Sequence, residues 1–472
     1  MLFNSIEFLF FFLIVTPAYF LLPFVHRWKL LLVASCYFYM TFVPVYILIL
    51  GFTIVIDYFA GILIEQSSGK RRKNYLILSL AANIGVLAVF KYYNFLNDNL
   101  SLLLGNFNYS NEIPYLSILL PIGLSFHTFQ AMSYTIEVYR GNQKAERHFG
   151  IYSLYVMFYP QLVAGPIERP QNVLPQLHTK HNFNYKDAVE GLKLIAWGLF
   201  KKVVIADRLS IYVDAVYNNS ADRSASSLII ATVFFTFQIY CDFSGYSDMA
   251  LGTARVMGYK LMVNFRRPYL AKTIKEFWSR WHISLSTWFR DYLYIPLGGN
   301  KVKYYRWYIN IFIVFMVSGL WHGANWTFII WGALHGFYQI MSIALKNVNE
   351  KNLLGYRPLT NLMHILITFA LVSFAWIFFR ANSVQHAFQI IESIFTLKQG
   401  TLFVGTPAGF AYSILGILFL ILVEYTVEYH PNKLLIFNNP NRIIRYSGYV
   451  TIVLLIVLFG VFSGTQFIYF QF

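Results

Sequence analysis

The stretch WYINIFIVFMVSGLWHGANWTFIIWGALHGFYQIMSIAL, residues 307–345, contains no Asp, Glu, Lys or Arg in 39 residues. A helix needs about 20 mostly apolar residues to cross the hydrocarbon core of a membrane, so this run is expected to lie in a bilayer. It nevertheless carries two histidines, His322 and His335. Ionisable side chains at membrane depth are costly and mark functional sites by default. The stretch therefore predicts both a membrane fold and a candidate site inside it.

The composition of the whole chain supports a membrane fold. The sequence is 57% hydrophobic and only 12% charged, about half the charged fraction of an ordinary soluble protein. Further runs without Asp, Glu, Lys or Arg lie at 8–25, 30–56, 74–90, 113–136, 224–241, 358–379, 399–423 and 447–472. They lack the alternation of apolar and polar residues that a transmembrane β-barrel requires. The sequence therefore predicts an all-α polytopic membrane protein.

The distribution of basic residues predicts the topology. The formal net charge of +16 is explained by basic residues on cytoplasmic loops, so it does not require a nucleic-acid partner. The segments expected to be cytoplasmic are 26–29, 69–73, 140–147, 260–306, 346–357 and 433–445, and those expected outside are 97–112 and 381–404. If successive loops alternate between the cytoplasmic and the outer side, the chain crosses the membrane about 12 times and both termini lie outside. This alternation also requires that 30–65 form two helices broken at Pro44 rather than one kinked helix.

Two segments are not typical membrane spans. Residues 159–177 contain four prolines and are expected to form a re-entrant or surface loop, because irregular backbone at membrane depth must be buried in protein or line a wet cavity. Residues 274–292 have apolar side chains at helical spacing, which predicts one amphipathic helix at the cytoplasmic interface. Its polar stripe would be Lys275, Ser279, His282, Ser286 and Arg290. We find no soluble domain and expect residues 1–472 to form a single membrane-embedded domain.

His322 is the strongest candidate for chemistry. It lies 16 residues after Arg306, which places it roughly 24 Å along a helix and more than halfway through the hydrocarbon core. A histidine titrates near neutral pH and is suited to act as a general base. The alternative is a neutral core histidine bonded to a backbone carbonyl. For His335 we favour a role as a core histidine.

The roles of the other polar residues remain open. The 260–306 region has ten basic residues against two acidic ones, which fits either cytoplasmic sorting or a site for an anionic ligand. Asp242 could orient a catalytic group, pair with a basic residue or play a hydrogen-bonded structural role. Gln238 and Ser244 lie close to it in the sequence. No zinc-ligand spacing, phosphate-binding glycine loop or serine elbow is present in the sequence, so no metal site is expected.

Five strings together resemble the membrane-bound O-acyltransferase (MBOAT) family, and most closely its bacterial alginate O-acetyltransferase branch. They are LPIGLSFHTFQAMSY (120–134), YPQLVAGPIERP (159–170), FQIYCDFSGYSDMALG (237–252), EFWSRWHISLSTWFRDYLYIPLGGN (276–300) and SGLWHGANWTFIIWGALHG (318–336). The core motifs therefore fall within 120–345, and 346–472 would add further helices.

The resemblance implies a fold and roles for particular residues. It implies a ring of about 11–12 tilted helices around a central tunnel, with an acyl group entering from a cytoplasmic thioester and leaving on an acceptor at the far side. The essential histidine of the family falls on His322, and a second family position falls on His282. The remaining residues expected near the substrate are Gln238, Asp242, Ser244, Ser279, Arg280, Trp321 and Asn325.

The branch also implies substrates and partners. Acetyl-CoA would be the donor substrate, with no tightly bound cofactor, in a bacterial plasma (inner) membrane. The acceptor would be an exported polysaccharide such as alginate or peptidoglycan, reached with an extracytoplasmic SGNH-type acetyltransferase or acceptor protein. Two alternatives stay open: D-alanyl transfer to teichoic acid from a carrier-protein thioester, and a polysaccharide or lipid transporter without chemistry.

Overall fold

The computed structural model describes residues 1–472 except 118–120, 164, 346–356, 431–438, 463–466 and 469–472. Within these described ranges, all regular secondary structure is helical, which confirms the predicted all-α class. The chain forms two compact units, one of residues 1–195 with 247–262 and the other of residues 196–246 with 263–472. The predicted basic loop at 346–357 lies outside the described residues up to residue 356, and that at 433–445 lies outside them up to residue 438. The single-domain assignment stays a prediction.

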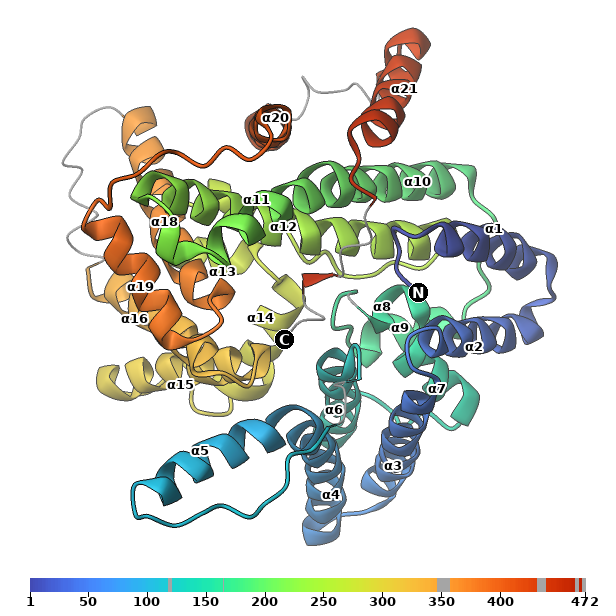
Figure 1. The fold of residues 1–472 in the computed structure, drawn as a ribbon. Helices are drawn as coiled ribbons and strands as arrows, with labels where there is room; N and C mark the ends of the chain where they lie inside the picture. Colours follow the sequence, from blue (N-terminus) through green and yellow to red (C-terminus); the bar gives the residue numbers. More distant parts are fainter. Residues whose placement is uncertain (118–120, 164, 346–356, 431–438, 463–466, 469–472) are drawn as a thin grey trace. The chain divides into compact units, whose positions relative to one another are not determined.

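The first unit consists of short and long helices from the amino-terminal part of the chain (Figure 1). These are α1 (Ile6–Leu21), α2 (Phe24–Met40), α3 (Ile47–Gln66), α4 (Gly69–Leu87), α5 (Tyr93–Gly105), α6 (Leu124–Arg140), α7 (Phe149–Met157), α8 (Tyr159–Leu162) and α9 (Pro170–Leu177). A 3₁₀ turn at Pro44–Tyr46 separates α2 from α3. The chain before it is extended at Val43, as expected for a residue that precedes proline. The two-helix prediction for 30–65 is therefore confirmed.

The second unit contains most of the longer apolar helices. Two helices pass from one unit into the other: α10 (Tyr185–Leu199) and α12 (Ala225–Val256). The remaining helices are α11 (Asp207–Tyr217), α13 (Ile274–Arg280), α14 (Ile283–Phe289), α15 (Tyr304–His322), α16 (Trp326–Ala344), α18 (Arg357–Arg380), α19 (Val384–Phe395), α20 (Pro407–Tyr429) and α21 (Arg442–Phe459). A π-helical turn, Phe200–Ala206, joins α10 to α11.

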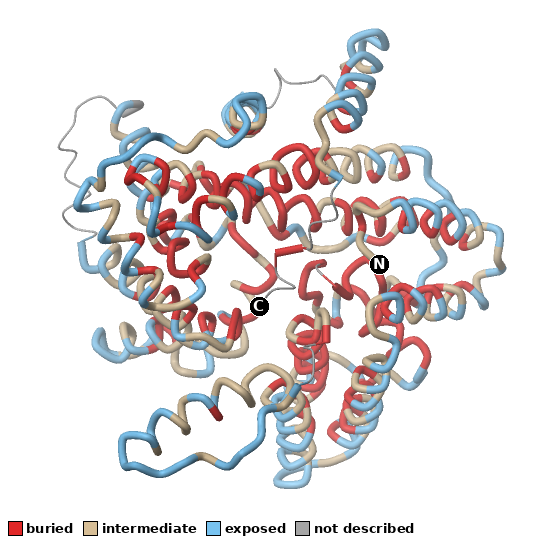
Figure 2. Tube along the Cα trace, viewed as in Figure 1, coloured by how far each residue is buried: buried red, intermediate tan, exposed pale blue. Residues whose placement is uncertain are grey.

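Length, composition and exposure together identify a multi-pass membrane protein. Among the described residues, seven helical segments are long and apolar enough to cross a membrane: Pro44–Gln66, Gly69–Gly105, Ala225–Val256, Trp326–Ala344, Leu359–Arg380, Pro407–Tyr429 and Arg442–Phe459. Figure 2 shows α20 and α21 mostly exposed, although their exposed side chains include Leu415, Leu422 and Val457. Large apolar patches of this kind are unusual in contact with water. They are the surface that a lipid bilayer covers.

The predicted cytoplasmic clusters of the first unit are joined to one another. The guanidinium of Arg27 donates to the backbone carbonyl of His181, and Arg72 donates to that of Tyr139 at 2.7 Å. His178 Nε2 lies 2.7 Å from Glu146 Oε2. The contact of Arg72 with Tyr139 brings the 69–73 cluster next to the 140–147 cluster, and both are expected on the cytoplasmic side. The 178–181 stretch, to which the sequence assigned no side, contacts both the 26–29 and the 140–147 clusters.

The 159–177 segment forms two short helices, α8 and α9, with irregular backbone between them. Val163, Ile167 and Glu168 in that connection are buried. The backbone is therefore irregular but enclosed by protein, as the four prolines predict.

Close packing between α15 and α16 positions the candidate site in the second unit. The helices form a hairpin joined by residues 323–325 (Figure 1). A Cβ on Gly319 would come within 2.3 Å of the carbonyl oxygen of Phe328, and a Cβ on Gly332 within 2.4 Å of that of Phe315. Small residues allow membrane helices to approach this closely. Larger side chains at either position would force the two backbones apart.

Gly319→Ala is expected to lower the free energy of unfolding by about 1–3 kcal/mol, because an added methyl group meets backbone atoms that have no flexible alternative. Thermal unfolding in detergent measures the effect. The matched control is Gly51→Ala in α3, where an added Cβ meets nothing within 4 Å. Equal melting temperatures for the two variants would contradict the close packing of α15 on α16.

Candidate active site

His322 is the last residue of α15, a helix of 19 residues that begins at Tyr304. The helix ends there because the chain turns extended at Gly323, whose N–H still bonds to Gly319. The side chain of Asn325 then caps α16 by accepting from the N–H of Thr327 at 3.0 Å, a common way to satisfy the first free amides of a helix. A helix does run from near Arg306 to His322, as assumed from the sequence, but it ends at His322.

Aromatic rings surround the His322 imidazole, which is only 3% exposed. Its ring centroid lies 5.0 Å from Trp321, 4.9 Å from Trp331 and 5.4 Å from Phe379, and each pair meets edge to face. Trp331 in turn stacks on Trp376 at 5.6 Å. The ring is therefore held in one orientation in a low-dielectric environment, where electrostatic interactions with a substrate are stronger than in water.

His282 lies at a break in the predicted amphipathic helix. The single helix expected over 274–292 was wrong, because α13 ends at Arg280 and α14 begins only at Ile283. Between them His282 adopts a left-handed conformation with φ 42° and ψ 55°, which an L-residue rarely takes and which interrupts a right-handed helix. Asn264 stabilises the break, since its backbone carbonyl accepts from Ile283 N at 2.9 Å and its side chain accepts from Ser284 N at 3.2 Å.

The break buries His282 instead of placing it on a polar stripe. The side chain is 0% exposed, so its expected place on the exposed stripe with Lys275 and Ser279 was also wrong. Its ring centroid lies 4.7 Å from Phe243. Burial lowers the pKa of His282 to about 3, because the charged imidazolium is poorly solvated there. The ring is therefore neutral at physiological pH.

Trp321 connects the two histidines. Its ring centroid is 6.2 Å from that of His282 and 5.0 Å from that of His322. Three of the residues predicted from the sequence are thus brought together, although they come from two different helical segments. His335 is a core histidine, as predicted: it is 0% exposed, and its Nδ1 accepts from the indole N–H of Trp278 at 3.3 Å.

Asp242 pairs with a basic residue, one of the roles open to it from the sequence. Lys202 Nζ lies 2.5 Å from Asp242 Oδ1 and 2.7 Å from Asp207 Oδ1, and all three side chains are buried. The second oxygen of Asp242 accepts from the backbone N–H of Ile468 at 2.7 Å. Ser244 accepts from the ammonium of Lys201 at 2.9 Å. Asp242 therefore links α12, the π-helical turn and the carboxyl-terminal segment.

Sequence reasoning missed Lys201, Lys202 and Asp207. The signal available was FKKVVIAD, residues 200–207, in which two lysines interrupt an apolar run. The π-helical turn over Phe200–Ala206 is a further sign, since such turns often occur at functional sites.

The remaining predicted residues are more dispersed. Gln238 is largely buried, and its Oε1 makes no hydrogen bond within the described part of the chain. Asn325 also donates to the carbonyl of Asn382 at 3.3 Å. Ser279 is exposed and donates to the Glu276 carbonyl at 2.7 Å. The structure therefore gives Asn325 and Ser279 local structural contacts.

Arg280 is part of an ion-pair network. Its Nη2 lies 2.7 Å from Glu276 Oε1 and 2.9 Å from Glu428 Oε1, and Arg267 Nε lies 2.5 Å from the other Glu428 oxygen. These carboxylates compensate the positive charge of both arginines. Arg280 is thus less suited to bind an anionic ligand than the count of basic residues suggests.

Together these features define a class: a multi-pass helical membrane protein with two buried histidines bridged by a tryptophan. Residues 147–384 match the membrane-bound O-acyltransferase family, and this range contains all nine residues predicted from the sequence. The chain is 37% identical to a peptidoglycan O-acetyltransferase of Helicobacter pylori, over 78% of this chain and 73% of that protein. It is 39% identical to a probable alginate O-acetylase of Pseudomonas aeruginosa, over 84% of this chain and 75% of that protein.

A more distant similarity is to a teichoic acid D-alanyltransferase of Bacillus subtilis, 28% identical over 56% of this chain and 70% of that protein. The match to the family covers half of the chain, and the O-acetyltransferase relatives cover more than three quarters of it. The chain belongs to the membrane-bound O-acyltransferase family and is an O-acyltransferase.

Lys202→Met is expected to lower the free energy of unfolding by about 3–5 kcal/mol, because it leaves two buried carboxylates without their ammonium group. Thermal unfolding of the purified protein measures the loss. The matched control is Lys193→Met on α10, which breaks the partly exposed pair with Glu190 and should cost about 1 kcal/mol or less.

Combining Lys202→Met with Asp207→Asn and Asp242→Asn removes all three charges and should recover part of the stability. If Lys202→Met melts like Lys193→Met, the buried ion cluster does not stabilise the fold as argued.

Proposed function

We propose that this protein moves an acetyl group from cytoplasmic acetyl-CoA across the membrane for O-acetylation of an exported or cell-wall polysaccharide, with His322 as general base. The observation that carries the proposal is a buried histidine at the end of α15, held among aromatic rings inside the region that matches the family. The acetyl donor is supported by the two O-acetyltransferase relatives, which cover more of the chain than the D-alanyltransferase does.

The chemistry assigned to His322 is proton transfer. The imidazole takes the proton from an attacking hydroxyl, whose oxygen bonds to the thioester carbonyl carbon. The carbon–sulfur bond then breaks, the thiolate receives the proton from the imidazolium, and an acetyl ester and the free thiol of CoA result. Enclosure of the ring by Trp321, Trp331 and Phe379 excludes competing water.

His282 is assigned a different role because it lies at the break between α13 and α14 rather than at the end of α15. A neutral imidazole retains one N–H, and this group can donate a hydrogen bond to the thioester carbonyl oxygen as negative charge develops there. We therefore assign His282 to orient the thioester and His322 to move the proton.

The acceptor and the cellular setting follow from the branch of the family. We propose an alginate- or peptidoglycan-type glycan as the final acceptor and an SGNH-type acetyltransferase as the extracytoplasmic partner, in the plasma membrane of a bacterium. The acetyl group would reach His322 through the tunnel that the family resemblance implies. The transporter alternative lacks support, because the chain is an O-acyltransferase by family membership.

His322→Ala and His322→Gln are both expected to lower acetyl transfer at least about 100-fold, the contribution of a typical general base. Transfer of radiolabelled acetyl groups to glycan in membranes measures the effect, and protein level and melting temperature are recorded in parallel. The Gln variant fills the same space and keeps a polar group, so it separates lost chemistry from a lost fold. The control is His430→Ala, which changes an exposed histidine at the end of α20. Full activity in either His322 variant would remove the catalytic assignment.

The purified protein is expected to consume acetyl-CoA and to leave a D-alanyl carrier-protein thioester intact. Release of free thiol measures which of the two thioesters the protein consumes, and the His322→Gln variant gives the background rate. Preference for the aminoacyl donor would identify the protein with the D-alanyltransferase branch and contradict the acetyl donor.

A further inference from the structure

A cavity of about 280 Å³ lies within the first unit, near the start of α2 and of α7. Its volume is close to the lower limit of the usual range for small-molecule sites. Most of its lining is apolar, with Phe24, Val25, Trp28, Ile151, Leu154 and Leu177. The polar part consists of Arg27, His148, His178 and two tyrosines, and none of the described residues that line the cavity is acidic. His178 is paired with Glu146, which lies outside the lining. A ligand that matches both parts carries an apolar group and an anion.

Arg27 brings a buried positive charge to this cavity. The residue is only 7% exposed, and its guanidinium donates three hydrogen bonds, all to backbone carbonyls: those of Phe20, Leu22 and His181. Over the ranges that the structure describes, no carboxylate pairs with it. A helix end carries roughly half an elementary charge, so the carbonyls at the end of α1 offset only part of the cation. Two of the five guanidinium N–H groups are left over from these three bonds. Because buried charges are normally paired with an opposite charge, Arg27 is suited to bind an anion.

The start of α2 adds donors to the same space. Phe24 and Val25, the first two residues of the helix, line the cavity, and the N-cap residue Pro23 offers no side-chain hydrogen bond. The positive end of a helix dipole and its first amides are a common binding site for phosphate. Tyr259 contributes a hydroxyl, because it accepts from Tyr19 at 3.1 Å and keeps its own proton. The polar part of the cavity is therefore rich in hydrogen-bond donors.

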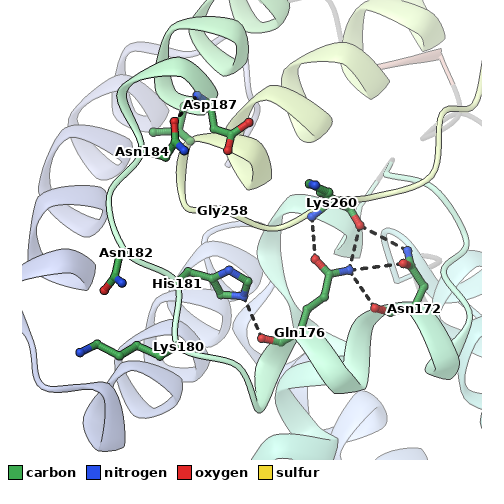
Figure 3. Close-up of a pocket in the computed structure, with 10 residues that line it drawn as sticks. Asn172, Gln176, Lys180, His181, Asn182, Asn184, Asp187, Gly258 and Lys260 are labelled. Atoms are coloured by element: carbon green, nitrogen blue, oxygen red, sulfur yellow. Dashed lines mark hydrogen bonds between the residues drawn. The ribbon is translucent and has the colours of Figure 1, made fainter.

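Neighbouring contacts hold these donors in place. A Cβ on Gly150 would lie 2.2 Å from the Trp28 ring, so α7 packs directly on the indole. His148 caps α7 through its Nδ1, which leaves the proton of the neutral ring on Nε2. His181, whose carbonyl accepts from the guanidinium, is itself held because its Nε2 lies 2.9 Å from the Gln176 carbonyl oxygen (Figure 3). The site is thus preorganised rather than formed by mobile side chains.

The cavity lies where lipid headgroups are expected. The 26–29 cluster, which contains Arg27, is predicted to be cytoplasmic, and the cytoplasmic leaflet carries anionic phospholipids. Val25, which lines the cavity, is 68% exposed, and Leu21 at the end of α1 is 85% exposed. Apolar side chains exposed in this way are covered by a bilayer. A soluble phosphate would use the donors but neither this surface nor the apolar lining, so the combination favours a phospholipid.

We propose that this cavity binds the headgroup of an anionic phospholipid of the cytoplasmic leaflet. The phosphate lies against Arg27, the first amides of α2 and the hydroxyl of Tyr259, and the glycerol and upper acyl chains follow Trp28 and the apolar residues of α7. Guanidinium and helix amides both suit phosphate oxygens, and basic pockets between membrane helices bind anionic lipids. The inference concerns the first unit alone and does not rest on the proposed acetyl transfer.

Val25→Glu is expected to weaken the binding of phosphatidylglycerol about tenfold or more, because the new carboxylate would pair with the guanidinium and repel the phosphate. The rise in melting temperature of detergent-solubilised protein with added lipid measures the affinity by mass action. Val25 is exposed, so the substitution leaves the packed interior unchanged. The matched control is His26→Glu, which adds a carboxylate to the same helical turn at an exposed residue that does not line the cavity. This variant should bind the lipid like the wild-type protein.

Arg27→Gln should weaken binding by a similar factor, and Lys29→Gln, at an exposed cation of the same cluster that does not line the cavity, is its control. Arg27 also joins the end of α1 to His181, so the melting temperature of this variant in phosphatidylcholine records any loss of fold separately. Two further ligands distinguish the sources of phosphate. Phosphatidylcholine carries a phosphate without net charge, and glycerol 3-phosphate carries the anion without acyl chains. Both should bind the wild-type protein more weakly than phosphatidylglycerol does.

A loss confined to Val25→Glu and Arg27→Gln, with both controls at wild-type affinity, supports the inference. Equal affinity for phosphatidylglycerol in the wild-type protein and Val25→Glu overturns it, as does equal binding of phosphatidylcholine and phosphatidylglycerol. Arg27-dependent binding of glycerol 3-phosphate that is as tight as that of the lipid would identify a site for a soluble phosphate and overturn the lipid assignment.

Discussion

The approach of α15 to α16 is the constraint on which the candidate site depends. Gly319 and Gly332 leave no room for a Cβ against the facing backbone, so the two helices meet closely and turn back within three residues. This geometry sets His322, at the end of one helix, against Trp331 in the other at 4.9 Å. In a membrane the association of helices depends on packing and hydrogen bonds rather than on the hydrophobic effect. The glycines therefore determine both the stability of the hairpin and the position of the imidazole.

The same low-dielectric interior explains why the buried Lys202 is fully compensated by carboxylates, and the partly exposed Arg267 and Arg280 are also paired. Lys202 is shared between Asp207 and Asp242, and Arg267 and Arg280 share Glu428. An isolated charge would be expensive there, while a fully bonded group is tolerated and specifies the arrangement of the segments it joins. His282 carries no charge to compensate, because burial keeps its imidazole neutral. A neutral ring beside Trp321 is compatible with the hydrogen-bonding role that we assign to it.

The parts of the fold that depend on local sequence could be predicted, and those that depend on distant contacts could not. Charge-free runs and Pro44 indicate membrane helices and a break, because both effects act on the segment that contains them. The break at His282 has no local signal, since the periodicity of 274–292 continues through it and the stabilising bonds come from Asn264. The pairing of Asp242 with Lys202 could likewise not be predicted, because Lys202 lies 40 residues away in the sequence.

Counting basic residues predicts the side of the membrane but not which of them can bind a ligand. Among the cations of 260–306, Arg280 is neutralised by two carboxylates. Lys260 belongs to the same run, yet its backbone is clamped by Gln176 while its ammonium group makes no contact of this kind among the described residues. The pairing of each charge, rather than the density of charges, therefore decides which basic residues are free to contact an anion, and only the three-dimensional structure reveals this pairing.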